Sequence, residues 1–318
     1  MRIGVVGLGS AGARHARAFR KIPGVTVVAA DLDAGRRERA AAEGVAAVAT
    51  LDEVLAEAPA GLVVAVPHER LADAALRALD AGCHVLLEKP MATRLDDARR
   101  VVEAARAARR LLMVSFVHRF RPDVAAAREL ISRGAIGRPT LVVDTMASGA
   151  SEMPSWVWDR QRAGGGMMLY NGIHQVDRAR FLLGDEAARV RAEVRTLGHE
   201  VDTEDTVGAL VTFRRGALAV IVQHKAPADA LACWDTQVFG TAGSLRIRTG
   251  DELRWTARGV VSTLPGGPED RFFGAASEFV SALRAGRPPS PSGEDGLAAL
   301  QIVSEMYEAG ARARAPGA

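Results

Sequence analysis

Lys89 is the residue whose type is hardest to explain by charge alone. The chain has 41 lysines and arginines together, yet lysine occupies only positions 21, 89 and 225. Arginine stays protonated in proteins, whereas a lysine amine can lose its proton when it is desolvated. Lys89 lies near the end of HVLLEKP, residues 84–90, directly after an apolar stretch and Glu88. We therefore predict a proton-handling amine at Lys89; the alternative is a surface ion pair with Glu88.

A second group of reactive side chains lies in GGGMMLYNGIHQVD, residues 164–177. Tyr170, His174 and Asp177 have the spacing of one face of a helix, which we predict over residues 166–183. Histidine can act as acid or base near neutral pH, and a tyrosine hydroxyl can bind a substrate oxygen. Tyr170 and His174 are therefore catalytic candidates, although a lone helical histidine is often structural. Asp177 is expected to orient a neighbour, to make a domain-closing contact or to contact substrate.

The segment GVVGLGSAG predicts a dinucleotide-binding loop. Gly7, Gly9 and Gly12 follow an apolar strand and open a helix, which is the GxGxxG arrangement. Gly7 would allow the tight turn, Gly9 the approach of a pyrophosphate, and Gly12 close packing of helix on strand. Ser10 and Ala11 lie at the start of the helix predicted over residues 11–21, whose N-terminal N–H groups favour phosphate. The same glycines could also mark an ordinary turn.

Asp31 strengthens this prediction. It ends the second strand pattern, VTVVAAD, and follows Gly12 by 19 residues. A carboxylate about 20 residues after the motif accepts hydrogen bonds from the adenosine ribose and repels a 2′-phosphate. NAD is the expected cofactor, although Arg36 and Arg37 could bind the extra phosphate of NADP. The alternative for Asp31 is a turn residue at the strand end.

Residues 2–116 alternate apolar strand patterns with helix patterns. Such alternation predicts a doubly wound parallel sheet of the Rossmann type, whose ligands bind beyond the carboxyl ends of the strands. Pro67 and Glu88 follow two of these strands and are expected beside the cofactor with Lys89. Glu88 would steady either the loop or the ammonium group, and Pro90 fixes the next peptide and can carry a cis bond.

The pattern changes near HRFRPD, residues 118–123, which predicts one domain over 1–120 and another over 121–318. Short-linked strands follow, so an α+β domain with an open-faced, mostly antiparallel sheet is expected. The predicted strands cover 140–147, 189–197, 205–213, 216–225, 233–240 and 243–248, and the predicted helices cover 123–133, 166–183, 273–285 and 294–311. One face of this sheet would be left for a subunit partner.

Composition excludes several classes of protein. The net charge is +3, and arginines are interspersed with acids, which argues against a nucleic-acid surface. No segment reaches the roughly 20 apolar residues of a membrane span, and no signal-peptide pattern is seen, so a cytoplasmic protein without membrane partners is expected. The spacing of Cys83 and Cys233 favours neither a disulfide nor a metal site, and buried thiols are expected.

The motifs GLGSAG, AGCHVLLEKPMA, FVHRFRP, GAIGRP and GGGMMLYNGIHQVDRARFLLG together resemble the Gfo/Idh/MocA family of glucose-fructose oxidoreductases and inositol dehydrogenases. The resemblance covers nearly the whole chain. It implies a Rossmann domain, a C-terminal open-faced sheet that often forms dimers or tetramers, and nicotinamide chemistry on sugars or cyclitols. The family lysine corresponds to Lys89 and its histidine to His174. Position 170 departs from the family pattern: many family members have an acid or an amide there, whereas this chain has Tyr170.

The function expected from these residues is hydride exchange between NAD(P) and a secondary alcohol or ketone of a sugar-like polyol. Lys89 would exchange the proton, and Tyr170 and His174 would bind or relay. The alternatives are a glycosidase or lyase that uses transient oxidation, and a non-catalytic NAD-binding regulator. Substrate-binding candidates are His118, Arg119, Trp156, Asn171 and Asp177. Trp158 is a further candidate, and both tryptophans could equally be core. His224 and Lys225 are expected at a surface strand end, with a pocket wall as the alternative.

Overall fold

The protein forms two compact units in the computed structural model, which describes residues 1–149, 153–265 and 270–313. The first unit contains Met1–Val117 and Asp270–Ala298. The second contains the described residues of His118–Glu269 and Ala299–Ala318. Helix α10 (Gly293–Arg312) supplies residues to both units.

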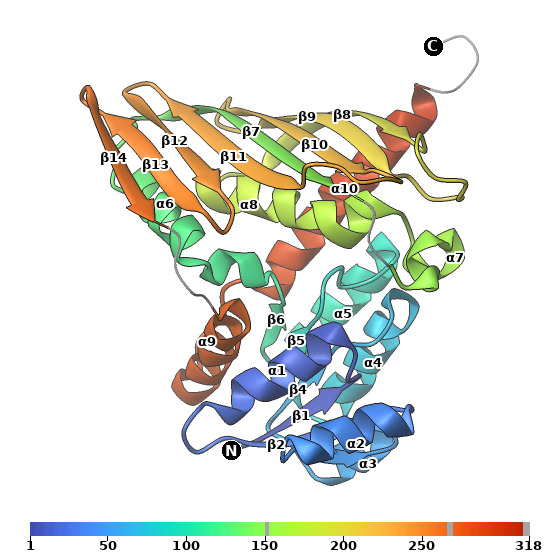
Figure 1. Ribbon diagram of the computed structural model, residues 1–318. Helices are drawn as coiled ribbons and strands as arrows, with labels where there is room; N and C mark the ends of the chain where they lie inside the picture. The colour runs from blue at the N-terminus through green and yellow to red at the C-terminus, as the bar shows by residue number, and fades with distance from the viewer. Residues whose placement is uncertain (150–152, 266–269, 314–318) are drawn as a thin grey trace. The chain divides into compact units, whose positions relative to one another are not determined.

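The first unit is built on a six-stranded parallel sheet (Figure 1). Its strands are β1 (Arg2–Val6), β2 (Thr26–Ala30), β3 (Ala46–Val48), β4 (Gly61–Val64), β5 (His84–Leu87) and β6 (Leu112–Val114). Their spatial order is β3-β2-β1-β4-β5-β6. The helices are α1 (Ser10–Arg20), α2 (Ala34–Ala42), α3 (Leu51–Ala56), α4 (His68–Asp80), α5 (Leu95–Ala107) and α9 (Arg271–Ala285). This is the predicted doubly wound Rossmann sheet.

The second unit is built on an eight-stranded sheet of order β14-β13-β12-β11-β7-β10-β9-β8. Among the strand pairings within the described residues of this sheet, that of β7 with β10 is parallel and the others are antiparallel. The strands are β7 (Pro139–Ser148), β8 (Ala187–Arg195), β9 (Thr206–Phe213), β10 (Leu218–Lys225), β11 (Cys233–Gly240), β12 (Gly243–Arg248), β13 (Glu252–Ala257) and β14 (Val260–Pro265). The helical segments are η1 (Val117–Phe120), α6 (Pro122–Ser132), η2 (Ser155–Trp158), α7 (Arg160–Ala163), the π-helical turn η3 (Met168–Gly172) and α8 (Ile173–Leu183).

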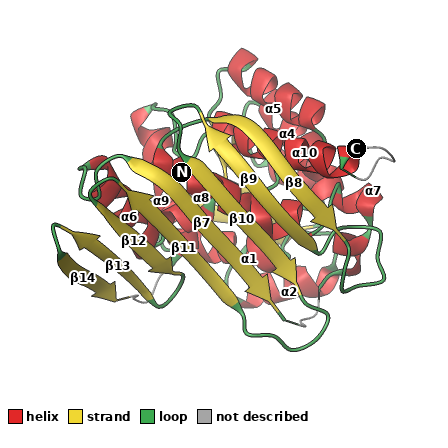
Figure 2. Ribbon diagram, turned by 90° about the horizontal axis from the view of Figure 1, so that it is seen from above, coloured by secondary structure: helices red, strands yellow, loops and turns green. Residues whose placement is uncertain are grey.

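Side chains alternate along the central strands of this second sheet. In β10, Ala219 and Ile221 are buried, whereas Val220 and Val222 are half-buried on the opposite face. Helix α8 contacts β7 and β10, and α6 contacts β12 and β13. Figure 2 shows both helices behind the sheet, with the strands uncovered on the near side. The predicted open-faced, mostly antiparallel sheet is therefore confirmed.

Several elements differ from the sequence prediction. Strand β3, helix α3 and the hairpin β13–β14 were not predicted, because their apolar patterns are short. Residues 270–298 pack with the first unit, although the predicted boundary placed them in the second. One reason is an aromatic contact: Phe279 of α9 meets Phe19 of α1 edge to face, with ring centroids 6.1 Å apart. A second is backbone pairing, since Met113 forms a β-bridge with Ser292.

Candidate active site

The loop between β1 and α1 has the geometry that a pyrophosphate requires. Gly7 adopts φ +87°, and a Cβ there would overlap the Ala65 carbonyl oxygen. A Cβ on Gly12 would overlap the carbonyl oxygen of Gly7. In contrast, among the described residues nothing outside the adjoining chain lies within 4 Å of a Cβ built on Gly9. Gly7 and Gly12 therefore allow close packing of the backbone, and Gly9 faces open space.

The N-terminus of α1 is suited to an anion. The helix begins at Ser10 after Gly9, with no side-chain cap and no acidic residue in its first turn. Ser10 is exposed and Ala11 is half-buried. The first N–H groups of a helix lack partners within it and lie at its positive end. This terminus therefore fits a phosphate group.

Asp31 lies at the end of β2, beside this loop. Its carboxylate accepts hydrogen bonds from the backbone N–H groups of Leu8 (2.7 Å) and Asp33 (2.9 Å). Arg36 Nη1 lies 3.3 Å from the same carboxylate. Arg37 instead donates to the carbonyl oxygens of Asp31 and Leu32. Arg36 is thus the arginine paired with the carboxylate that is predicted to bind ribose.

The sheet topology explains why these residues gather. The strand order reverses between β1 and β4, and ligands of doubly wound sheets bind at that reversal, beyond the carboxyl ends of the strands. Gly7 follows β1 and touches Ala65, which follows β4. Pro67 then starts helix α4, and Lys89 follows the neighbouring strand β5. The predicted cofactor residues therefore lie on one edge of one sheet.

The segment Glu88–Pro90 places a lysine beside a buried carboxylate. The Lys89–Pro90 peptide is cis, and the backbone N–H of Lys89 lies 3.3 Å from Glu88 Oε2. Desolvation of the half-buried amine lowers the pKa of Lys89, and the Glu88 charge opposes this shift only in part. Lys89 thus has the environment of an amine that loses its proton more readily than a free lysine.

Glu88 itself binds a residue that was not predicted for the site. Its Oε1 atom lies 2.8 Å from Nε2 of His15, a fully buried residue of α1. Burial acts to raise the pKa of Glu88, but interactions with His15, Lys89 and Ser115 outweigh it, so the pKa lies below its ordinary value. Glu88 is therefore an anion between α1 and Lys89, and its predicted role in steadying the loop agrees with these contacts.

In the second unit, the start of the predicted helix is held by its glycines. A Cβ on Gly165 would overlap the Tyr307 hydroxyl, and one on Gly166 would overlap the Glu204 carbonyl oxygen. The buried Glu204 carboxylate accepts from the N–H groups of Gly166 (2.7 Å) and Met168 (3.0 Å) and from Tyr307 Oη (2.8 Å). The glycine triplet thus permits close packing on Glu204 and Tyr307.

The predicted helix 166–183 is not uniform. Residues 168–172 form a π-helical turn, and α8 begins at Ile173. Tyr170 therefore lies in a wider turn than the predicted α-helix, and His174 lies in the regular helix that follows. Tyr170 and Asn171 both lie in the π turn and are half-buried, whereas His174 is buried.

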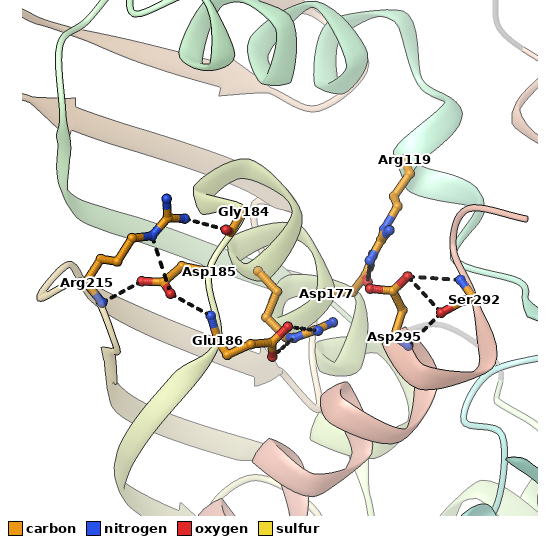
Figure 3. Close-up of polar contacts among 9 residues, drawn as sticks. Arg119, Asp177, Gly184, Asp185, Glu186, Arg215, Ser292 and Asp295 are labelled. Atoms are coloured by element: carbon orange, nitrogen blue, oxygen red, sulfur yellow. Dashed lines mark hydrogen bonds and ion pairs between the residues drawn. The ribbon is translucent and has the colours of Figure 1, made fainter. Parts of the chain in front are cut away.

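The C-terminal end of α8 is also fixed, as Figure 3 shows. Arg215 donates to the carbonyl oxygens of Leu183 (2.9 Å) and Gly184. Its backbone N–H donates to Asp185 (2.8 Å), and Arg180 pairs with Glu186 (2.6 Å). A guanidinium on the last carbonyls satisfies acceptors that a helix end leaves open. Helix α8 is therefore held at both ends.

Two aromatic contacts join predicted site residues within this unit. The rings of His118 and His174 meet edge to face with centroids 4.6 Å apart, and His118 lies 4.5 Å from the ring of Trp234. Tyr170 meets Trp156 at 6.0 Å. Trp156, Tyr170, His118 and Trp234 are all half-buried. These contacts bring together residues that the sequence named separately, and they add Trp234, which it did not name.

Arg119 and Asp177, both predicted to bind substrate, bind each other. Arg119 Nη2 lies 2.6 Å from Asp177 Oδ1 and its Nε lies 3.0 Å from Oδ2 (Figure 3). Side-chain exposures are 8% and 3%. This two-pronged buried ion pair joins η1 to α8 and supports the orienting role that the sequence suggested for Asp177.

A buried network supports Trp234 and α8 from the sheet. Asp144 of β7 is fully buried and accepts from Gln175 (2.7 Å), Trp234 Nε1 (3.0 Å) and Thr236 (2.7 Å). Arg178 lies 3.7 Å from the centroid of the Trp234 ring. Desolvation raises the pKa of Asp144 and lowers that of Arg178 to about 10. The network ties the indole to the helix that carries His174.

The structure agrees with some of the remaining predictions and contradicts others. Trp158 stacks on His199 at 4.7 Å. Lys225 was expected at the surface but is 2% exposed and donates to the Gly149 carbonyl oxygen, because the alternation of β10 turns it toward the covered face. Cys83 is buried as expected, but Cys233 is exposed.

Among the described residues there is no group of three or more metal-ligating side chains and no helix that could span a membrane.

Residues 1–116 match a family model described as an oxidoreductase family with an NAD-binding Rossmann fold, and residues 124–246 match the GFO/IDH/MocA C-terminal domain. A 1,5-anhydro-D-fructose reductase from Ensifer adhaerens is 33% identical, over 84% of this chain and 83% of that protein. A myo-inositol 2-dehydrogenase from Thermotoga maritima is 30% identical, over 95% and 94%.

Among solved structures, an NAD-binding oxidoreductase from Klebsiella pneumoniae is similar with a TM-score of 0.90. It is 25% identical, and the match covers 99% of this chain and 98% of that one. The match to the first family model covers all six strands of the parallel sheet, and the second covers β7 to β11 and the start of β12 in the second sheet. This chain belongs to the Gfo/Idh/MocA family of NAD-binding oxidoreductases.

Proposed function

We propose that this enzyme transfers hydride between NAD and a secondary alcohol or ketone of a sugar, cyclitol or closely related polyol. The observation that carries the proposal is the common edge shared by the glycine loop, Asp31 and Lys89 in one parallel sheet. The relatives named for 1,5-anhydro-D-fructose and myo-inositol support this substrate class. A ring bearing several hydroxyl groups suits a site with imidazole, indole and phenol side chains.

The cofactor residues divide by the part of NAD that they would hold. Gly7, Gly9, Ser10, Ala11 and Gly12 would bind the pyrophosphate through backbone N–H groups at the start of α1. Asp31 would accept from the adenosine ribose, with Arg36 beside it, and Pro67 and Glu88 would shape the nicotinamide end of the sheet edge. When bound, NAD accepts or supplies the hydride.

The protein itself would manage the proton. Lys89 takes the hydroxyl proton during oxidation and returns it during reduction. His174 and Tyr170 bind the reacting oxygen or relay the proton, while His118, Trp156 and Asn171 contact the rest of the substrate. Arg119 and Asp177 act in this proposal through each other, since their polar groups form one buried ion pair.

A panel assay tests the function. Purified enzyme is mixed with aldoses, ketoses, cyclitols and sugar acids, each with NAD⁺ or NADP⁺, and the reverse direction is tested with NADH. We expect a change in nicotinamide absorbance with at least one sugar or cyclitol. Tight NADH binding in a calorimetric titration without any such change across the panel would contradict the proposed substrate class.

Asp31→Asn is expected to weaken NADH binding by about 10- to 100-fold and to reduce the preference over NADPH. The carboxylate offers charged hydrogen bonds to the ribose, and a bond to a charged group contributes about 1.5 to 3 kcal/mol. Titration of NADH and NADPH fluorescence measures both dissociation constants. Asp33→Asn is the matched control, because Asp33 caps α2 two residues away. Equal NADH affinity in wild type and Asp31→Asn would refute the ribose contact.

The pH dependence follows from the lowered pKa of Lys89. In oxidation the neutral amine is the active form, so kcat is expected to rise with pH, with a midpoint below the ordinary lysine value of 10.5. In reduction the ammonium is active, so kcat is expected to fall through the same group. Steady-state kinetics in both directions provide the measurement. Profiles that move in the same direction would argue against Lys89 as the proton carrier.

We further propose a homodimer or homotetramer that forms through the uncovered face of the second sheet. Neighbouring strands place apolar residues together there: Val220 pairs with Val143 and Leu210, and Phe239 pairs with Leu141. Phe239 is 40% exposed. Apolar patches of this kind commonly mark subunit interfaces.

Val220→Glu is expected to shift the enzyme toward monomers, because a charge would lie in the middle of the interface. Sedimentation velocity measures the change, and Leu197→Glu, at an exposed loop position, is the control. An unchanged assembly in Val220→Glu, or a monomeric wild type, would contradict the proposed interface.

We place the enzyme in the cytoplasm in this proposal, where NAD and sugar metabolites are both available. The absence of a membrane-spanning helix among the described residues is compatible with this location. Fractionation of the source cells, followed by detection with an antibody, tests it.

A further inference from the structure

We infer that His15 is a positioning residue for Lys89. It holds the Glu88 carboxylate through a buried hydrogen bond, and Glu88 in turn precedes and contacts Lys89. The inference rests on the proposed role of Lys89 as the proton-handling amine. It assigns a function to a helix histidine that lies outside the predicted site residues.

The contacts form a short buried chain. His15 Nε2 lies 2.8 Å from Glu88 Oε1 and 3.1 Å from Ser115 Oγ. Glu88 Oε2 lies 3.3 Å from the Lys89 N–H. His15 is fully buried, Ser115 is 1% exposed and Glu88 is 8% exposed. Three elements therefore meet at the carboxylate: α1, the end of β5 and the end of β6.

The ring orientation of His15 follows from this carboxylate. A carboxylate accepts hydrogen bonds, so Nε2 is the nitrogen that carries hydrogen. Nδ1 is buried and has no hydrogen-bond partner among the described residues. The ring face instead meets Phe272 edge to face, with centroids 4.9 Å apart. Apart from the nearby Ser115 hydroxyl, the polar bonding of His15 is thus directed at Glu88.

Packing alone does not explain such a pair. Two apolar side chains would fill the same core without the cost of desolvating a carboxylate. The pair has a use because Glu88 adjoins Lys89. The groups whose charges act on Glu88 are His15 and Lys89, and the charge of Glu88 opposes the desolvation of Lys89. His15 therefore keeps this anion in place at the residue that directly precedes the reactive lysine.

The location of His15 adds a link to the cofactor. His15 lies in α1, whose first residues would bind the pyrophosphate, five residues after the exposed Ser10. The bond to Glu88 connects that helix to the segment that ends in Lys89. The same helix thus orients both the phosphate loop and the reactive lysine.

The scarcity of lysine allows a direct test that needs no substrate. The chain contains lysine only at positions 21, 89 and 225, in separate peptides. Trace labelling of the intact enzyme with acetic anhydride across a pH series, followed by peptide mass spectrometry, measures the titration midpoint of each amine. Lys21, with a side chain 59% exposed, is the internal reference.

His15→Leu is expected to lower the Lys89 midpoint by about 0.5 pH unit or more, because Glu88 loses its donor and is more easily protonated. Glu88→Gln should lower it further, by about 1 unit, since the charge is removed outright. His15→Gln, whose amide can still reach the carboxylate, should stay within about 0.2 unit of wild type. Phe19→Leu, a buried change on the same helix, is the control and should leave the midpoint unchanged.

NADH binding and thermal melting verify that each variant is folded. If His15→Leu is not folded, His15→Asn replaces it, because its shorter amide does not reach Glu88. A Lys89 midpoint that falls in Glu88→Gln but stays at the wild-type value without His15 would overturn the inference. So would an equal fall in Phe19→Leu. Because labelling requires no turnover, these results are independent of whether Lys89 proves catalytic in the panel assay.

Discussion

Lys89→Arg is expected to lower kcat by about 10²- to 10⁴-fold while the enzyme still binds NADH. Arginine keeps the positive charge and much of the length, but it cannot give up a proton near neutral pH. A residue that only paired with Glu88 would tolerate this change, since the ion pair would survive. The measurement is steady-state kinetics with the best substrate of the panel, in both directions.

The control is Lys21→Arg. Lys21 forms an exposed ion pair with Asp270, at 2.6 Å, and its conversion should leave kcat within about twofold because exposed pairs contribute little. NADH fluorescence titration of both variants separates lost chemistry from lost cofactor binding. Turnover of Lys89→Arg near the wild-type rate would remove Lys89 from the proton path and leave His174 as the principal candidate.

Breaking the Arg119–Asp177 pair is the other change with a large expected effect. Removal of one partner, in Arg119→Met or Asp177→Leu, leaves a buried charge and should cost about 3 to 5 kcal/mol of unfolding free energy. The double variant should recover most of this loss, because apolar residues of similar size can replace a buried pair. Denaturant unfolding of the three variants and the wild type gives the coupling directly.

The same set of variants decides between two roles for the pair. If Arg119 and Asp177 only position η1 against α8, the refolded double variant should keep KM within a few-fold of wild type. If either residue binds substrate, KM should rise by about tenfold or more even where stability is restored, since one charged hydrogen bond contributes about 1.5 to 3 kcal/mol. Stable folding of both single variants would contradict the buried ion pair itself.

Much of the fold was predictable because its signals are local. The continuous burial of β4 and β5 appears in the sequence as apolar runs, and Gly7, Gly9 and Gly12 each have the geometry that their positions suggested. The second sheet was predictable from alternation and short turns. The edge hairpin β13–β14 was not, because half-exposed and exposed edge strands carry little apolar periodicity.

Individual site residues could be predicted from the sequence, but the contacts that support them could not. Lys89 and His174 stand out by type and position, whereas His15, Trp234 and Asp144 act through partners 73 to 100 residues away or on other strands. His15 could have been suspected, since a polar residue interrupts the buried face of α1. Nothing local shows that Arg119 and Asp177, 58 residues apart, bind each other.

The π turn at Met168–Gly172 allows this site to change through the insertion or deletion of one residue, instead of through substitution of a side chain. A regular α-helix advances about 100° per residue, so deletion of Asn171 or Gly172 would rotate the preceding residues, Tyr170 included, relative to His174. The helix itself would survive such a deletion, because α8 is fixed by Arg215 at its far end. A single codon gained or lost could therefore change which side chain of this turn lies on the same side of the helix as His174.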